Sequence, residues 1–439
     1  MAATENGSSY IKRLASMRKQ TVVASVDIYN EHGLLLLKKG FPIDPRKAEL
    51  LVVHKLLQPI EDSVNFDRLI TAADLYERLV QNMRGCADLL ALEARWTLFN
   101  RVRSYCQDLA GFPLLSQKLT VMAEQLPHTL DKCLLTAYLA TGLAQGANWP
   151  ESQQRAAFFA AALHELGMLH LPQELLTKEG AYTAEEHRTM QAHSVIGQTI
   201  LTNVRGLPAG VDRAVLEHHE RCDGSGYPKG LFGGDLSPLG KLLGLADTIQ
   251  ALRFGKRNVR HLTLSHLVPI LQLSGDLFAT DLLAVAQREL REQHHEDGRY
   301  AALELPELAR KVAGGLRDQQ QVARLLADQP LTIDRSHRVG SSLEISLHHY
   351  LNTVNQAGLL FEALPGYVEQ MGASRRDTDP HAQHQLEEME LLVEELQFLC
   401  RRLQHKLELA GRQGKMREAG RISEMLGALS QKRPQQQEG

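Results

Sequence analysis

The stretch HHERCDGSGYPKGLFGGDL, residues 218–236, decides the fold, because a long loop rich in glycine and proline interrupts segments whose apolar residues recur at helical spacing. Glycine and proline end helices, so this stretch forms a connection between two of them. Unusually long connections inside a helical domain are in most cases functional or disordered. Two adjacent histidines open this one. The sequence therefore predicts a mostly α-helical domain with a functional site at the start of the loop.

Other residues with metal-ligand chemistry lie on the helical segments around the loop. His164 and Glu165 occur in AALHELG, His193 occurs in MQAHSVIG, and Asp247 follows the loop in GLADTIQAL. Neutral imidazoles and carboxylates bind Fe, Mn or Zn and leave positions open for water and substrate. Taken singly, each residue has a simpler explanation as an ordinary helix residue, because the chain has 19 histidines. The set as a whole predicts a hydrolytic metal site.

In order and spacing, these residues resemble the HD-GYP family, a branch of the HD phosphohydrolases. Residues 218–236 resemble its signature loop almost residue for residue. Residues 164–197 resemble the segment from its HD pair to its third metal histidine, and residues 241–252 resemble the segment of its final metal aspartate. Three separate segments in the right order make chance a poor explanation.

The resemblance implies a helical domain that cleaves cyclic di-GMP at a centre of divalent metal ions, here Fe or Mn, with two ions if the site is intact. It implies that Glu165 is a catalytic residue as well as a metal ligand. The implied metal ligands are His164, Glu165, His193, His218, His219 and Asp247. The implied substrate-binding residues are Gly226, Tyr227 and Pro228 in the loop and Lys241 after it.

The departures from the family pattern fall on chemistry rather than on packing. Glu165 stands where the family has an aspartate, and Lys132 stands where it has its first metal histidine. A protonated lysine has no lone pair for a metal, and His128, one helical turn earlier, lies about 6 Å away along the axis. Met168 replaces a lysine expected near the substrate phosphate, and Gln250 replaces an aspartate. Each change weakens the expected active site.

Two functions of different classes fit these residues. The first is a metal-dependent phosphohydrolase of bacterial cyclic di-GMP signalling. The second is a catalytically silenced domain that senses the cyclic dinucleotide or acts as a scaffold for signalling proteins, such as diguanylate cyclase domains by analogy with the family. The loop suits both, whereas Lys132 and Met168 favour the second. A purely structural helical domain would leave the intact loop without a physical reason.

Composition excludes some partners. The chain of 439 residues has 49 Lys and Arg against 52 Asp and Glu, for a net charge of −3, so no basic field predicts nucleic-acid binding. Its five cysteines show no CxxC pair, which favours a reducing compartment. The polar first twenty residues lack a signal-peptide core, and no apolar run has the length of a membrane span. We expect a cytoplasmic protein.

The length predicts several structural pieces around the central domain. TVVASVDIY and GLLLLKKG, separated by turn residues 30–33, predict a hairpin in a small β-containing module. The expected order is a β-containing N-terminal module at 1–65 after a polar start, linking helices at 66–113, the HD-GYP-like domain at 114–260, a helical extension at 261–372, a coiled-coil helix at 381–412 and a disordered tail at 413–439.

The last expected helix carries a regular apolar seam. Its members alternate three and four residues apart: Leu386, Met389, Val393, Leu396, Cys400, Leu403, Leu407 and Ala410. Such spacing is typical of a short coiled coil, which would pair two chains into a homodimer. An amphipathic helix packed on the rest of its own chain has the same spacing and is an equally good interpretation.

Overall fold

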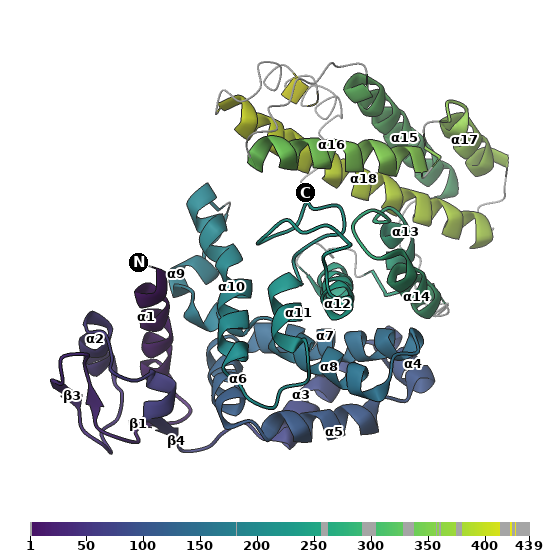
Figure 1. Ribbon diagram of the computed structural model, residues 1–439. Coiled ribbons are helices and arrows are strands. Elements are labelled where there is room, and N and C mark those ends of the chain that lie inside the picture. Colours follow the sequence, from purple (N-terminus) through teal and green to yellow (C-terminus); the bar gives the residue numbers. More distant parts are fainter. Residues whose placement is uncertain are drawn as a thin grey trace. The chain divides into compact units, whose positions relative to one another are not determined.

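The computed structural model describes residues 2–180, 182–255, 262–291, 304–327, 338–356, 358–359, 361–374, 380–412, 422–423 and 426. The chain divides into two compact units (Figure 1). The first comprises Met1–Arg221 with Gly226–Gly255, and the second comprises Cys222–Ser225 with Lys256–Gly439. The predicted domain boundaries inside each unit stay predictions.

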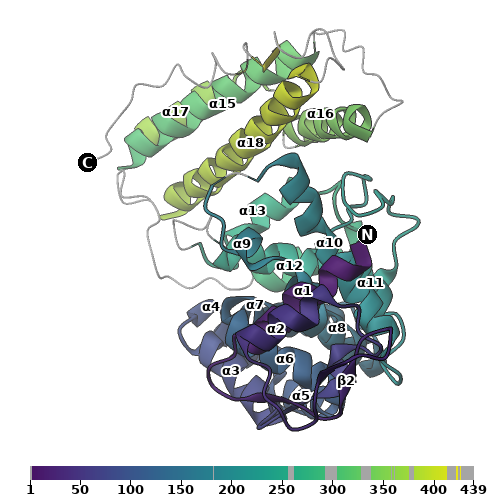
Figure 2. The same cartoon turned by 90° about the vertical axis from the view of Figure 1, so that its left-hand side faces the viewer.

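The first unit begins with a small mixed module. Its elements are α1 (Ala2–Ala15), β1 (Val22–Ala24), β2 (Ile28–Tyr29), β3 (Leu35–Leu37), α2 (Pro45–Val53), the 3-10 helix η1 (Ile60–Ser63) and β4 (Val64–Phe66). Strands β2 and β3 pair antiparallel, which confirms the predicted hairpin, and β1 pairs antiparallel with β4. Figure 2 shows α1 beside α2, and the two helices are in contact.

Helix α1 covers residues that the sequence presents as a polar start. Asn, Gly and Ser are weak helix formers, so propensity alone does not favour a helix there. Its buried side chains Tyr10, Ile11 and Leu14 recur at helical spacing and form one apolar face. Packing of that face stabilises a helix that propensity does not predict.

The helices that follow build the rest of the first unit. They are α3 (Ala72–Arg84), α4 (Ala87–Trp96), α5 (Phe99–Ala110), α6 (Pro113–Gln125), α7 (Pro127–Gly146), α8 (Glu151–Leu163), the 3-10 helix η2 (Leu166–His170), α9 (Gln173–Leu176), α10 (Ala184–Thr202), α11 (Val211–Glu217) and α12 (Pro238–Phe254). The predicted linking helices are thus α3, α4 and α5. They separate at Gly85 and at Thr97, whose φ of 51° ends α4.

Helix α7 forms the centre of this unit. It is buried on most of its circumference and contacts α3, α6, α8 and α12. A helix that is apolar all round belongs in a core rather than at a surface. At Gly142 a Cβ atom would lie 2.1 Å from the ring of Trp96, so only glycine allows this close contact. The mostly α fold is confirmed, and α7 carries Lys132 toward the candidate site.

The described part of the second unit is helical. Its helices are α13 (Leu267–Gln272), α14 (Thr280–Arg291), α15 (Leu305–Ala327), α16 (Arg338–Gln356), α17 (Leu364–Ser374) and α18 (Pro380–Arg412). Helix α18 packs on α15, α16 and α13 of the same chain. No helix among the described residues combines the length and the apolar character needed to cross a membrane.

The apolar seam of the last helix is buried inside this unit. Leu386, Val393, Leu396 and Leu403 are at most 4% exposed and belong to one core cluster with residues of α15 and α16. The structure thus favours the interpretation of an amphipathic helix packed on its own chain. A homodimer stays a prediction, and it would need a surface other than this seam. The side chain of Ala410 and the expected tail, apart from residues 422–423 and 426, lie outside the described residues.

Candidate metal centre

Three histidines of the predicted set are held in the same way. Nδ1 of His164, at the end of α8, lies 2.6 Å from the carbonyl oxygen of Ala161. His193 in α10 and His218 after α11 repeat the contact, with Nδ1 2.7 Å from the Met190 oxygen and 2.6 Å from the Val215 oxygen. A carbonyl accepts only from a protonated nitrogen, so Nδ1 carries a proton in all three rings and Nε2 is the nitrogen left to face the cluster. Metal-binding histidines are oriented in this manner.

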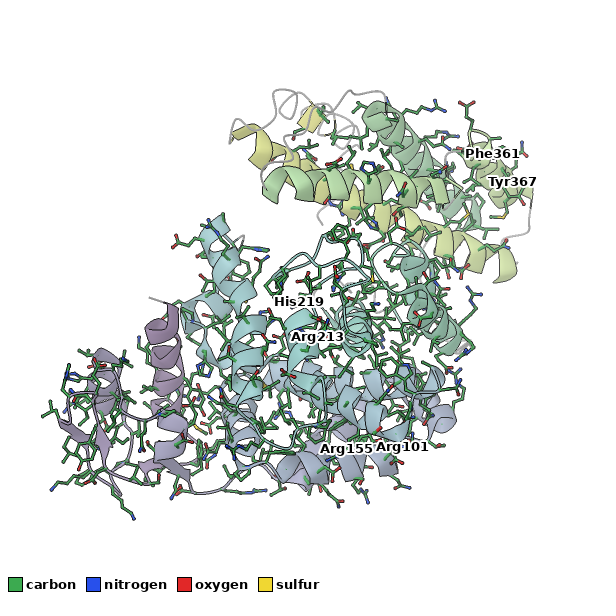
Figure 3. All side chains as sticks on the ribbon, in the orientation of Figure 1. Arg101, Arg155, Arg213, His219, Phe361 and Tyr367 are labelled. Atoms are coloured by element: carbon green, nitrogen blue, oxygen red, sulfur yellow. The ribbon has the colours of Figure 1, made fainter. Side chains whose placement is uncertain are left out.

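The nitrogens on the opposite side of the rings from Nδ1 lie close together. The ligand nitrogens of His193, His218 and His219 all lie within 4.8 Å of one another, and Nε2 of His193 is 3.2 Å from Nε2 of His218. Figure 3 labels His219, which lies two residues after the end of α11, the helix that contacts both α10 and α12. These three imidazoles form a face that one metal ion can bind.

The other predicted ligands complete the cluster. Asp247, in α12, places Oδ1 3.5 Å from Nε2 of His164, and Glu165 places Oε2 3.6 Å from Nε2 of His193. Nε2 of His164, Oε2 of Glu165 and Oδ1 of Asp247 are buried and make no hydrogen bond. Buried polar atoms left in this state are costly, and coordination of a cation removes the cost. The donor set therefore fits a divalent metal.

A close backbone approach brings Glu165 and His193 together. Gly167, two residues after Glu165, faces α10, and a Cβ atom there would lie 1.9 Å from the carbonyl oxygen of His193. No side chain larger than hydrogen fits at that distance. The glycine of the HELG sequence thus allows η2 and α10 to pack closely enough for their ligands to meet.

Protonation states mostly favour metal binding. Burial, with the charges of His164 and His193, lowers the pKa of His218 to about 3, and burial lowers the pKa of His219 well below its usual range. Burial raises the pKa of Glu165, but His193, His164 and Lys132 lower it by more. The cluster therefore supplies neutral imidazoles and an ionised carboxylate.

His164 differs from its neighbours. Burial lowers its pKa, but the sulfur of Cys133 and the carboxylate of Asp247 raise it by more, and the pKa ends well above its usual value. The same pair holds the pKa of Asp247 well below its usual range. In the absence of metal, His164 and Asp247 thus form an ion pair, and a metal must displace the imidazole proton.

Of the positions that depart from the family pattern, Lys132 lies beside the cluster. Nζ of Lys132 is 3.9 Å from Oε1 of Glu165, so an ammonium lies beside the cluster. Burial lowers the pKa of Lys132, but Glu165 and Asp247 raise it by more, and the group stays charged. His128 is exposed in the first turn of α7, and among the described contacts none joins it to the cluster. Met168 is half-buried in η2.

The signature loop packs directly on the histidines. The ring of Tyr227 lies 4.7 Å from that of His219, and its backbone N–H donates to the His219 carbonyl oxygen. At Gly226 a Cβ atom would lie 2.3 Å from the Cα atom of Glu220, so glycine is required there as well. Pro228 follows in the same turn. Lys241 lies in the first turn of α12, and no described side-chain contact joins it to the cluster.

Sequence reasoning missed the residues that hold this loop. The buried carboxylate of Glu220 accepts hydrogen bonds from the backbone N–H groups of Lys229, Gly230 and Leu231. The guanidinium of Arg221 donates to the His218 carbonyl oxygen and to the hydroxyl of Thr248. Both follow the histidine pair directly in HHER, and an acid and a base inside a glycine-rich loop were the available signal.

A third missed residue holds the far end of the loop. Glu217 is 3% exposed, and its carboxylate accepts hydrogen bonds from the backbone N–H and hydroxyl of Ser237, the N-cap of α12. Arg213, labelled in Figure 3, pairs with the same carboxylate at 2.6 Å. Glu217 and Glu220 thus hold the two ends of the loop against α11.

Comparison with known proteins agrees with this geometry. A family model described as "HD domain" matches residues 113–279. The chain is 29% identical to 3'3'-cGAMP-specific phosphodiesterase 1 of Vibrio cholerae over 41% of this chain and 45% of that protein. It is 41% identical to a cyclic di-GMP phosphodiesterase of Thermotoga maritima over 21% of this chain and 26% of that protein. The chain spans less than half the length of these relatives.

One further relative and one solved structure are similar to parts of this chain. Cyclic di-GMP phosphodiesterase PA4108 of Pseudomonas aeruginosa is 33% identical over 28% of this chain and 29% of its own length. The structure of Bd1817, a HDG"Y"P protein from Bdellovibrio bacteriovorus, covers 64% of this chain and 97% of that chain at 15% identity; its TM-score of 0.34 is too low to bear on the fold. The matched HD domain and these cyclic dinucleotide phosphodiesterase relatives support an HD-GYP family protein.

Proposed function

We propose that this chain is a metal-dependent phosphohydrolase that hydrolyses a phosphodiester bond of a cyclic dinucleotide, cyclic di-GMP in the first place, in bacterial signalling. The observation that carries the proposal is the convergence of the His193, His218 and His219 nitrogens beside buried carboxylate oxygens that make no hydrogen bond. Relatives named for cyclic di-GMP and 3'3'-cGAMP support the substrate class.

We assign metal binding and catalysis to different residues of the cluster according to their chemistry. His193, His218 and His219 would hold one divalent ion, Fe or Mn, and His164 and Asp247 would hold a second. The chemistry that bound ions supply is Lewis-acid charge, which activates water and the phosphodiester. Glu165 lies between the two groups, with one oxygen near His193 and the other near Lys132, and is the proposed catalytic carboxylate.

The loop and α12 would bind the substrate. Tyr227 presents an aromatic ring beside His219, and such a ring is suited to stack on a base or to border a ribose. Gly226 and Pro228 keep the backbone of this turn against the cluster. Lys241 is the proposed phosphate contact, although it supplies a point charge rather than the bidentate fork of an arginine.

A silenced HD-GYP domain is the alternative, and one observation favours it. Lys132 keeps its proton beside Glu165 and Asp247, so a charged ammonium stands where the family has a metal-binding histidine. An ammonium repels an incoming cation and donates no lone pair. A chain of this kind would keep its cleft to sense the nucleotide and its loop to bind signalling proteins, such as diguanylate cyclase domains. The five free cysteines suit the reducing compartment in which such a protein would work.

Turnover of cyclic di-GMP separates the two functions. The full chain is loaded with Mn²⁺, or with Fe²⁺ under anaerobic conditions, and substrate consumption is followed for three proteins: the native chain, His218→Ala, and Lys132→His combined with Met168→Lys. If the chain is an active phosphohydrolase, the native chain turns over cyclic di-GMP and His218→Ala abolishes this turnover. Turnover that occurs only in the double variant, which restores a ligand and a phosphate contact, identifies the silenced domain.

A further inference from the structure

The N-terminal helix α1 contacts the 3-10 helix that directly follows the predicted ligands His164 and Glu165. Helix η2 begins immediately after Glu165, and α1 packs on it within the first unit. The contact is made by polar groups on both sides, since Arg13 of α1 is 3% exposed and His170, the last residue of η2, is 9% exposed. Buried polar contacts between elements so distant in sequence are specific in geometry.

All the hydrogen-bond acceptors of Arg13 belong to one short segment. Its Nε donates to the Leu169 carbonyl oxygen at 3.0 Å, and its Nη2 donates to the Leu171 carbonyl oxygen at 3.0 Å. Its Nη1 donates to the side-chain oxygen of Gln173. A planar guanidinium that meets three acceptors in this way fixes both the position and the direction of the segment.

Neighbouring residues seat Arg13 and the end of η2 together. The ring of Tyr10, one turn earlier in α1, stacks on His170 with centroids 5.1 Å apart and an angle of 12° between the planes. Nζ of Lys118, from α6, lies 3.0 Å from Nε2 of His170 and 3.4 Å from the centre of the Tyr10 ring. Glu61, which precedes β4, pairs with Lys118. The N-terminal module thus holds η2 through several contacts.

The opposite end of η2 directly follows the predicted ligands His164 and Glu165. The backbone N–H of Met168 donates to the Glu165 carbonyl oxygen at 2.9 Å, and Gly167 touches the backbone of His193. Only five residues form η2, so a shift of Leu169 or Leu171 moves Glu165 and alters its distance to His193. Groups that hold ligand-bearing segments in place control metal affinity.

We propose that Arg13, seated by Tyr10, is a positioning residue of the metal centre, through which the N-terminal module sets metal affinity. This inference rests on the metal site of the proposed function, and it does not depend on whether the chain turns over a cyclic dinucleotide. It also gives the N-terminal module a structural connection to the site.

Metal binding by variants of the full chain tests this inference. Mn²⁺ affinity is measured by calorimetry, and the visible spectrum of the Co²⁺-loaded protein reports ligand geometry. We expect Arg13→Met to weaken Mn²⁺ binding about tenfold and to change the Co²⁺ spectrum, since partners of metal ligands contribute about 10–100-fold to affinity. Arg13→Lys keeps the charge without the fork and should fall between Arg13→Met and the native chain.

A stability control separates positioning from general loosening. Leu79 is fully buried in α3, a helix that contacts α4, α5 and α7 but is not among those packed on η2. Leu79→Ala should lower the melting temperature and leave Mn²⁺ affinity within about twofold of the native value. Equal losses of affinity in Leu79→Ala and Arg13→Met would overturn the inference, as would an unchanged affinity in Arg13→Met.

Failure of the metal site itself would look different. In that case the native chain would not bind Mn²⁺, or His218→Ala would bind it as tightly as the native chain does, and both the inference and the metal site would be wrong. A native chain that binds Mn²⁺ and loses it in His218→Ala, with Arg13→Met unchanged, would overturn the inference alone.

Discussion

Two clusters of buried polar residues lie in the first unit, and they are satisfied in opposite ways. In the charge cluster, made of Tyr10, Arg13, Glu61, Lys118 and His170, the charged groups contact partners from other elements of the same chain and the Tyr10 ring stacks on His170, while the buried Tyr10 hydroxyl makes no hydrogen bond. In the metal cluster, made of His164, Glu165, His193, His218, His219 and Asp247, Nε2 of His164, Oε2 of Glu165 and Oδ1 of Asp247 make no hydrogen bond, and Nε2 of His193 faces Nε2 of His218.

The difference teaches how to tell a structural cluster from a functional one. A cluster whose groups pair with each other is complete without a ligand, so its residues contribute to stability. A cluster whose buried nitrogens and carboxylate oxygens make no hydrogen bond is completed by a cation, so its residues contribute to binding. The histidine in each cluster illustrates the point: Nε2 of His170 meets Lys118, whereas Nε2 of His164 makes no hydrogen bond.

The largest effect is expected in the charge cluster. Lys118→Met removes a cation that is 1% exposed and leaves Glu61 without its partner, which should lower the free energy of unfolding by about 3 kcal/mol. Denaturant unfolding of the metal-free chain measures it. The exposed pair of Arg68 with Asp74 is the control, and Arg68→Met should cost less than about 1 kcal/mol. Equal costs in the two variants would show that Lys118 is not structurally important.

Removal of the metal should lower the stability of the chain through the metal cluster. With free Mn²⁺ at about 100 times its dissociation constant, the metal stabilises the folded chain by about 2.7 kcal/mol, and chelation abolishes this gain. Thermal unfolding with and without chelator measures the difference. Leu79→Ala should retain the full metal-dependent gain, because α3 is not among the helices packed on η2. A stabilisation by Mn²⁺ that survives in His218→Ala would place the metal elsewhere.

Glu220 belongs to neither cluster and tests how the loop is held. Glu220→Gln keeps one acceptor oxygen but replaces the other by an amide, so the backbone N–H groups of Lys229, Gly230 and Leu231 lose part of their acceptor. The expected cost is about 1–2 kcal/mol. Hydrogen exchange should speed up at these three amides. Exposed Glu179 supplies the control, and Glu179→Gln should change neither stability nor exchange.

The smallest effect concerns pH. Because the pKa of His164 is raised, its imidazole is protonated near neutral pH, and a metal must displace that proton. Mn²⁺ affinity should therefore rise about tenfold per pH unit from about pH 6 to pH 7, as proton release by one group requires. Cys133→Ala removes one cause of the raised pKa and should reduce this slope. An affinity independent of pH would mean that His164 is neutral before metal binds.

Part of this arrangement follows from the sequence, and the reason is local. His218, His219, Tyr227 and Gly226 lie within one loop, and the remaining ligands are on helices whose apolar periodicity is plain, so their type and order predict the cluster. The charge cluster does not follow, because Arg13 and Tyr10 lie in a polar run more than 150 residues from the segment they hold. Sequence spacing carries no signal for such a contact.

The last helix shows a second limit of sequence reasoning. A seam of residues three and four apart is the same whether its partner is another chain or another helix of the same chain. In this protein α15 and α16 supply the partner, and Leu396 and Leu403 are buried against them. The pattern predicts burial correctly but does not identify the covering surface.

The metal content of the purified chain tests the central claim most directly. Elemental analysis after loading with Mn²⁺ or anaerobic Fe²⁺ should find at least one ion per chain in the native protein and in His128→Ala, whose histidine is exposed in α7. His218→Ala should lose that metal. Mutation of a residue that only supports a metal ligand already lowers metal affinity about 10–100-fold, and removal of a ligand itself lowers it further. Equal metal content in His218→Ala and the native chain would contradict the assignment of the cluster as a metal centre.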